Sequence, residues 1–115
     1  MQAYEIRQLM DWSEQHAGKK MYIEFLRVPS MSMGLYTLKA GAKDPQEPHS
    51  EDEVYYIVSG RGMIHVAGED RPVQQGSIVF VKAYDDHRFH SITEDMQILV
   101  FFAPAEYSQA KKDGG

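Results

Sequence analysis

The chain has 115 residues, of which 43% are apolar and 25% charged, and a formal net charge of −5 at pH 7, which is typical of one soluble globular domain spanning residues 1–115. Because the net charge is negative and Lys and Arg form no clustered run, nucleic acid is not expected as a partner. It contains no cysteine, which excludes disulfides, thiolate nucleophiles and cysteine-based metal sites.

The amino end predicts an extension of about 20 residues that contains one short helix. Ile6, Leu9 and Met10 recur at helical spacing and Gly18 is a suitable stop, so we expect a helix over about residues 3–17. This end lacks the basic start and apolar stretch of a secretory signal, and no segment approaches the roughly 20 apolar residues of a membrane span. We therefore expect a cytoplasmic protein without membrane contact, with a flexible tail over about residues 108–115.

From Met21 onward the sequence predicts short β-strands. Runs rich in Ile, Val, Phe, Tyr and Met alternate with clusters of Gly, Pro, Asp and Ser, and residues 68–70 provide a turn for a hairpin between Val66 and Val73. The expected strands are 22–26, 34–40, 54–58, 62–66, 77–81, 88–92 and 96–102. So many strands with so little helix favour an all-β, closed or double-sheet architecture.

Residues suited to metal binding gather in two glycine-bounded blocks, 41–60 and 76–91. On an extended strand Glu47 and His49 leave the same face, roughly 6.6 Å apart along the chain, so they can share one ion. A straight strand would place Glu53 roughly 13 Å beyond His49, so residues 50–52 must bend if all three are to meet. The second block adds His87 from a distant strand, and two imidazoles with carboxylate form a donor set that first-row divalent metals accept.

These blocks resemble the cupin family. The first cupin motif reads Gly, five residues, His, one, His, three or four, Glu, six, Gly, and the chain matches it with Gly41, His49, Glu53 and Gly60, while Glu47 stands at the first histidine. The resemblance covers about residues 33–104. It implies a jelly-roll β-barrel with the ion inside and frequent dimerisation through an outer sheet face, here offered by residues 54, 56 and 58.

The second cupin motif reads Gly, five, Pro, one, Gly, two, His, three, Asn. Gly76 and His87 match it, whereas Lys82, Tyr84 and Ser91 stand in place of Pro, Gly and Asn. The resemblance implies one divalent metal ion, Fe, Mn, Zn or Ni, at His49, Glu53 and His87, and Glu47, which replaces the first histidine of the motif, is the candidate for the fourth ligand.

Glu47 leaves two arrangements open. If it binds, two carboxylates cancel the charge of a divalent ion and favour harder ions such as Mn²⁺ or Fe²⁺. If it turns away, two His and one carboxylate form the facial triad of non-haem iron oxygenases. The other histidines, His16, His65 and His90, are expected to be exposed or satisfied within the core.

We expect a metal-dependent, dioxygenase-like enzyme that acts on a small organic molecule as a homodimer. Glu47 or Glu53 would move a proton and the Tyr55 hydroxyl would orient the substrate. Two alternatives are a metal-dependent isomerase or lyase with Glu47 as general base, and a non-catalytic barrel that binds or senses a small ligand.

Overall fold

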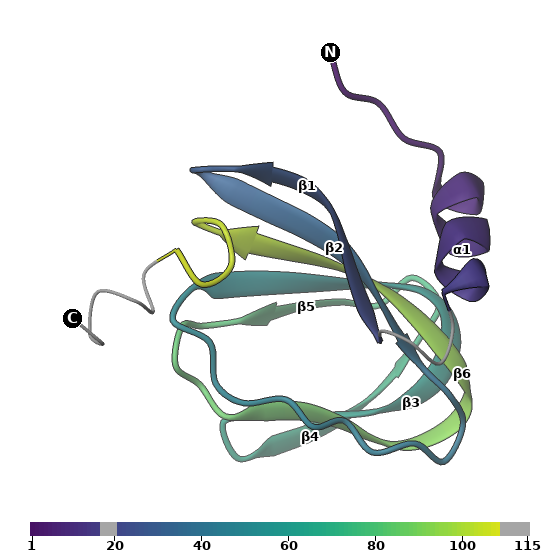
Figure 1. The fold of residues 1–115 in the computed structure, drawn as a ribbon. Coiled ribbons are helices and arrows are strands. Elements are labelled where there is room, and N and C mark those ends of the chain that lie inside the picture. The colour runs from purple at the N-terminus through teal and green to yellow at the C-terminus, as the bar shows by residue number, and fades with distance from the viewer. Residues whose placement is uncertain (17–20, 109–115) are drawn as a thin grey trace.

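The computed structural model describes residues 1–16 and 21–108, and its strands pair only in antiparallel fashion within these ranges (Figure 1). The elements are α1 (Ile6–Gln15), β1 (Tyr22–Val28), β2 (Met31–Leu38), β3 (Asp52–Val66), β4 (Glu69–Gln74), β5 (Ile78–Val81) and β6 (His87–Ala103). The predicted all-β barrel with a short N-terminal helix is confirmed. The proposed stop at Gly18 and the tail after residue 108 lie outside the described ranges, and a single domain over residues 1–115 stays a prediction.

Two long strands connect the whole sheet. Its order is β1-β2-β6-β3-β4, with β5 paired to β3. The first part of β3 pairs with β5 and the last part with β4, while β6 follows β3 along almost its whole length. The sequence predicted two separate strands in each of these stretches, but each is one continuous strand.

The break that the sequence indicated within β3 is a change of register. Inward side chains are odd-numbered at Tyr55 and Ile57 but even-numbered at Ile64, because the pairing with β6 shifts between residues 57 and 63. Gly60 lies in this stretch with φ +96, and a Cβ there would lie 2.2 Å from the backbone oxygen of Asp95. Only glycine fits, so the strand can bend and still keep its apolar face inside.

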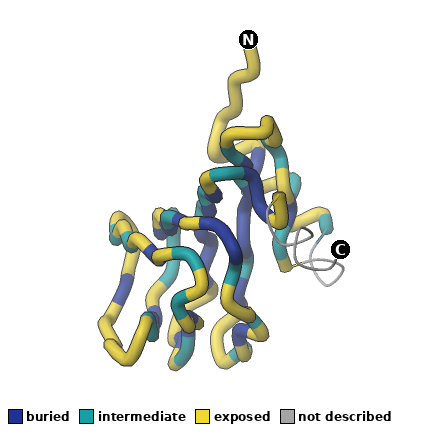
Figure 2. Tube along the Cα trace, turned by 90° about the vertical axis from the view of Figure 1, so that its left-hand side faces the viewer, coloured by how far each residue is buried: buried dark blue, intermediate teal, exposed yellow. Residues whose placement is uncertain are grey.

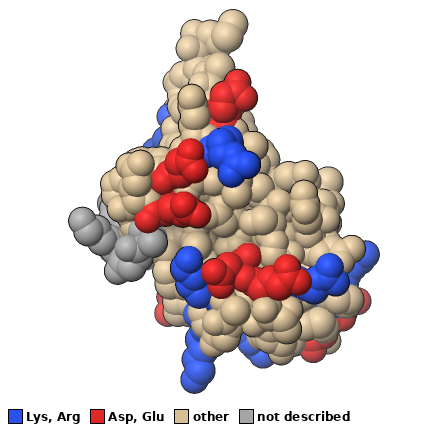
Figure 3. Space-filling model, turned by 90° about the vertical axis from the view of Figure 1, so that its right-hand side faces the viewer, with Lys and Arg blue, Asp and Glu red and all other residues tan. Residues whose placement is uncertain are grey.

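The core lies inside the barrel, and α1 lies outside it. Buried and exposed positions alternate along the strands (Figure 2), as expected for a sheet with one apolar face. The helix rests on β2, where Ser13 Oγ lies 3.0 Å from Thr37 Oγ1 and Leu9 is buried. On the face with α1, acidic and basic side chains are interspersed (Figure 3). No helix of the described residues has the length and apolar character needed to cross a membrane.

Candidate metal centre

The candidate metal centre forms where the chain enters β3. Ser50 and Glu51 form a bend immediately before the strand, and Glu53 is its first buried side chain. The bend turns His49 back toward Glu53, so that His49 Nδ1 lies 3.1 Å from Glu53 Oε2. The bend that the spacing required is therefore present.

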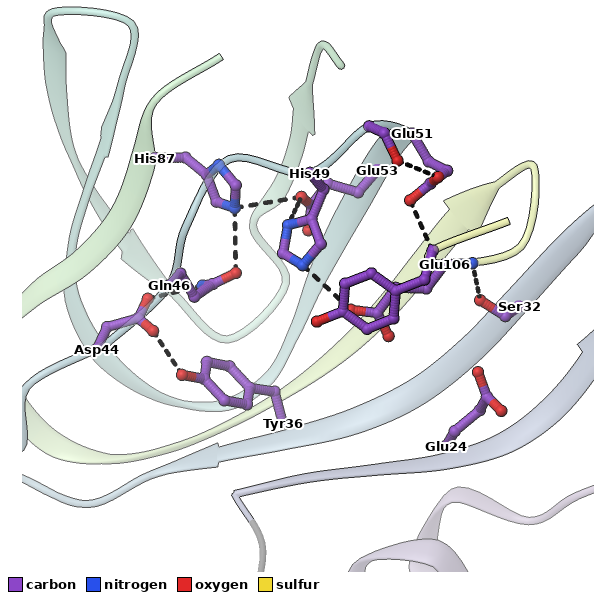
Figure 4. Close-up of polar contacts among 12 residues, drawn as sticks. Glu24, Ser32, Tyr36, Asp44, Gln46, His49, Glu51, Glu53, His87 and Glu106 are labelled. Atoms are coloured by element: carbon purple, nitrogen blue, oxygen red, sulfur yellow. Dashed lines mark hydrogen bonds and ion pairs between the residues drawn. The ribbon is translucent and has the colours of Figure 1, made fainter. Parts of the chain in front are cut away.

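His87 reaches the same point from the start of β6. The loop between β5 and β6 is held against the first block, because the Tyr84 N–H donates to the His49 carbonyl at 2.7 Å. His87 Nε2 lies 3.2 Å from Glu53 Oε2. The three side chains thus converge from two distant parts of the sequence (Figure 4).

The hydrogen bonds of His87 leave one ring nitrogen facing oxygen atoms. Its Nδ1 lies 2.9 Å from the Asp85 carbonyl, an acceptor, so Nδ1 carries a proton. Its Nε2 faces both Glu53 Oε2 and Gln46 Oε1, the latter at 3.0 Å. In the neutral ring this nitrogen carries a lone pair that faces two oxygen acceptors, and a bound cation would interact favourably with all three atoms.

His49 has the same kind of arrangement with the nitrogens exchanged. Its Nε2 lies 3.1 Å from Glu106 Oε2, and its Nδ1 faces Glu53. Burial would lower the pKa of His49, but the carboxylates of Glu106 and Glu53 outweigh it and raise that pKa to about 9. Without an ion, the ring is therefore held as a cation between two acids.

The donor set fits a divalent ion. Glu53 is only 2% exposed, yet neither of its oxygens has a hydrogen-bond partner, and His49 Nδ1 has none either, although it lies near Glu53. Separations of 3.1 and 3.2 Å from Glu53 Oε2 to the two nitrogens resemble those of neighbouring ligands around an ion with bonds of about 2.1 Å. Within residues 1–16 and 21–108, this group of three is the one close enough to hold an ion.

Glu47 is not brought into the group. It is exposed and lies on irregular chain between two prolines, so the alternation of an extended strand, on which its pairing with His49 was predicted, does not apply there. Its neighbour Gln46 points inward instead. Glu47 lines the cavity beside the site, and Tyr55 lines it too but is buried, with its hydroxyl donating to Gln46 Oε1 at 2.9 Å.

A cavity of about 390 Å³ opens beside the candidate metal centre. Aromatic and apolar side chains form much of its wall, and His49 and Glu106 face it. None of the described residues that line it is Lys or Arg. The site therefore offers room for a small organic molecule with apolar surface.

Two residues of the site were missed by sequence reasoning. Gln46 has no place in the motif spacing, and its role depends on which way an irregular loop turns. Glu106 lies in the turn after β6, beyond both motif blocks, and the fold brings it to His49 across the barrel. Neither position carries a periodicity or spacing from which it could have been found.

A family model described as Cupin domain matches residues 34–102, more than half of the chain. The chain belongs to the cupin family. Over 92% of its length this cupin is 46% identical to an uncharacterized protein of Streptomyces coelicolor, of which the match covers 99%. The predicted cupin membership is confirmed.

More distant relatives agree with the fold. The cupin is 25% identical over 83% of its length to the oxalate-binding protein of Thermotoga maritima, of which 71% is covered. Among solved structures, the protein TT1209 from Thermus thermophilus has a TM-score of 0.74 at 24% identity, over 91% of this chain and 99% of that chain. This last likeness shows the fold.

Proposed function

We propose that this cupin binds one divalent metal ion through His49, Glu53 and His87 and uses it in a dioxygenase-like reaction on a small organic molecule. One observation carries the proposal, the buried Glu53 carboxylate that faces two imidazole nitrogens and has no hydrogen-bond partner. Burying a carboxylate that has no hydrogen-bond partner carries a desolvation cost on the order of several kcal/mol, and a cation bound between Glu53 and the two imidazoles would offset it. Fe, Mn, Zn and Ni all accept this donor set, and Fe²⁺ suits the proposed reaction.

When bound, such an ion supplies Lewis acidity and the open coordination positions of a two-His, one-carboxylate site. The chain's own residues would position the ligand and move protons. Burial, followed by the charge of Glu53, raises the pKa of Tyr55 well above its ordinary value, so Tyr55 stays protonated and holds Gln46 through its hydroxyl. Glu47, exposed on the cavity wall, is free to accept a proton from a bound ligand.

Elemental analysis of protein purified without added metal tests the first half of the proposal. We expect one divalent ion per chain. Oxygen-uptake assays with the Fe²⁺-loaded protein and a panel of small organic molecules that fit the cavity of about 390 Å³ test the second half. If the protein retains its metal but consumes no oxygen with any compound of the panel, the metal site is supported and the dioxygenase-like reaction is contradicted.

The second candidate is a barrel that binds a small ligand without turnover. It is supported by the relative from Thermotoga maritima, which is named as an oxalate-binding protein. Saturable ligand binding in calorimetry, with the ligand recovered unchanged, would favour this function. A metal-dependent isomerase or lyase with Glu47 as base would instead convert its substrate without consuming oxygen.

We also propose that two copies pair through an apolar outer face on β3 and β5. Register places Val54 beside Phe80 and Tyr56 beside Ile78, and Ile78 and Phe80 are 70% and 61% exposed. A two-fold dimer would bury this face against its own copy. Light scattering should give a dimer for the wild type and a monomer for Phe80→Asp, whereas a monomeric wild type would contradict the pairing. We also propose that the protein is located in the cytoplasm.

A further inference from the structure

Glu106 lies behind His49, on the side of the ring away from Glu53. Its side chain is 10% exposed, and its Oε2 lies 3.1 Å from His49 Nε2. It does not belong to the described group whose atoms are close enough to share an ion. An imidazole that binds an ion is neutral and has one N–H and one lone pair, so an acceptor at Nε2 leaves the lone pair on Nδ1, which faces Glu53.

The turn that carries Glu106 is fixed from both sides. The Glu106 N–H donates to Ser32 Oγ at 2.9 Å, and Arg27 Nη2 donates to the Glu106 carbonyl at 2.7 Å. The next N–H, of Tyr107, donates to the buried Glu51 carboxylate at 2.9 Å. These bonds tie the turn to β1, to β2 and to the bend before β3, so the carboxylate approaches His49 from a fixed direction (Figure 4).

His87 has the opposite orientation. Its Nδ1 donates to the Asp85 carbonyl, and its Nε2 faces Glu53. The acceptor behind each ring therefore selects a different nitrogen to face the shared carboxylate. A backbone carbonyl does this for His87, and the Glu106 carboxylate does it for His49.

We propose that Glu106 is a positioning residue of the metal centre: it accepts the proton of His49 Nε2 and so makes Nδ1 the metal-binding atom, while His87 binds through Nε2. This inference rests on the proposed metal site. A carboxylate hydrogen-bonded to a metal-binding imidazole fixes the orientation of the ring and raises its basicity. Loss of such a partner typically lowers metal affinity about 10- to 100-fold.

Competition between the protein and a chelator for Zn²⁺ measures the affinity. We expect Glu106→Ala to bind Zn²⁺ about 10- to 100-fold more weakly than the wild type. Glu106→Gln should recover part of this loss, because its amide oxygen still accepts the proton. Glu94→Ala is the matched control: it removes an acidic side chain that is 63% exposed and paired with Arg61, and it should leave the affinity unchanged.

Nitrogen NMR of the Zn²⁺-loaded, ¹⁵N-labelled protein tests the orientation directly. In the wild type, His49 should carry its proton on Nε2 and His87 on Nδ1. Glu106→Ala should alter the His49 signals and leave those of His87 in place, which a general loss of folding would not do.

Two results would overturn the inference: a wild-type His49 that binds Zn²⁺ through Nε2, or a Glu106→Ala protein with wild-type Zn²⁺ affinity. A wild type that binds no Zn²⁺ or any other divalent ion would instead overturn the proposed metal site itself. The wild-type titration therefore separates the two failures.

Discussion

Among the residues that the structure describes, two clusters of histidine and acid can be compared, one inside the barrel and one outside it. The inner cluster is His49, Glu53 and His87. In the outer cluster, His65 of β3 and His90 of β6 lie 3.2 and 2.8 Å from Asp70 Oδ1 of β4. The residue types are the same, but the Glu53 side chain is 1% exposed and that of Asp70 is 52% exposed.

The difference lies in how the polar atoms are satisfied. In the outer cluster a single carboxylate oxygen bonds to both imidazoles, and water can reach the rest of the carboxylate. In the inner cluster the carboxylate is buried, and neither of its oxygens has a hydrogen-bond partner. Buried polar groups are nearly always partnered, so the inner cluster is the one whose geometry calls for a cation. Composition alone would not have separated the two.

The largest expected effect is on metal content. His49→Ala/His87→Ala removes both imidazoles of the inner cluster, so we expect its metal content to fall to background in elemental analysis. The matched control, His65→Ala/His90→Ala, removes two imidazoles from the outer cluster and should retain one ion per chain. Equal metal loss in the two double variants would show that burial does not distinguish the clusters.

A smaller effect is expected on the free energy of unfolding. A ligand that binds only the folded state at about 100 times its Kd adds about 2.7 kcal/mol. Urea unfolding with and without Zn²⁺ should show this gain for the wild type and for His65→Ala/His90→Ala. The gain should be absent from His49→Ala/His87→Ala, and if it persisted there the ion would have to bind elsewhere.

Much of the fold followed from the sequence, because strand patterning and turn residues act locally. The predicted helix and strand positions agree with α1 and with parts of every strand except β4, for which only a hairpin between Val66 and Val73 was predicted, and the required bend before β3 is present. The continuity of β3 and β6 was missed. Their register shifts break the alternation of buried residues, which in sequence looks like the end of a strand.

The candidate site followed from the sequence only where its residues lie on regular elements or beside the bend. His49, Glu53 and His87 meet as the motif spacing predicted, although metal binding itself stays a prediction. Glu47 was placed by the alternation of a strand, but the chain there is irregular and turns Gln46 inward. Glu106 reaches His49 through a long-range contact between the last turn and β1 and β2, which no local pattern encodes.

The smallest expected effect concerns the pH dependence of the outer cluster. The hydrogen bond from His90, followed by that from His65, outweighs the slight burial and lowers the pKa of Asp70. An acid whose pKa is lowered by folding stabilises the folded state above its unfolded pKa, about 3.9 for aspartate, and loses that contribution as the pH falls through the folded value. Asp70→Asn should therefore lower the thermal midpoint slightly at neutral pH, and the difference from the wild type should vanish below the folded pKa. Because the carboxylate is exposed, screening by salt should shrink the difference at neutral pH as well. A difference that stayed constant with pH and salt would mean that Asp70 contributes through packing or turn geometry and not through its charge.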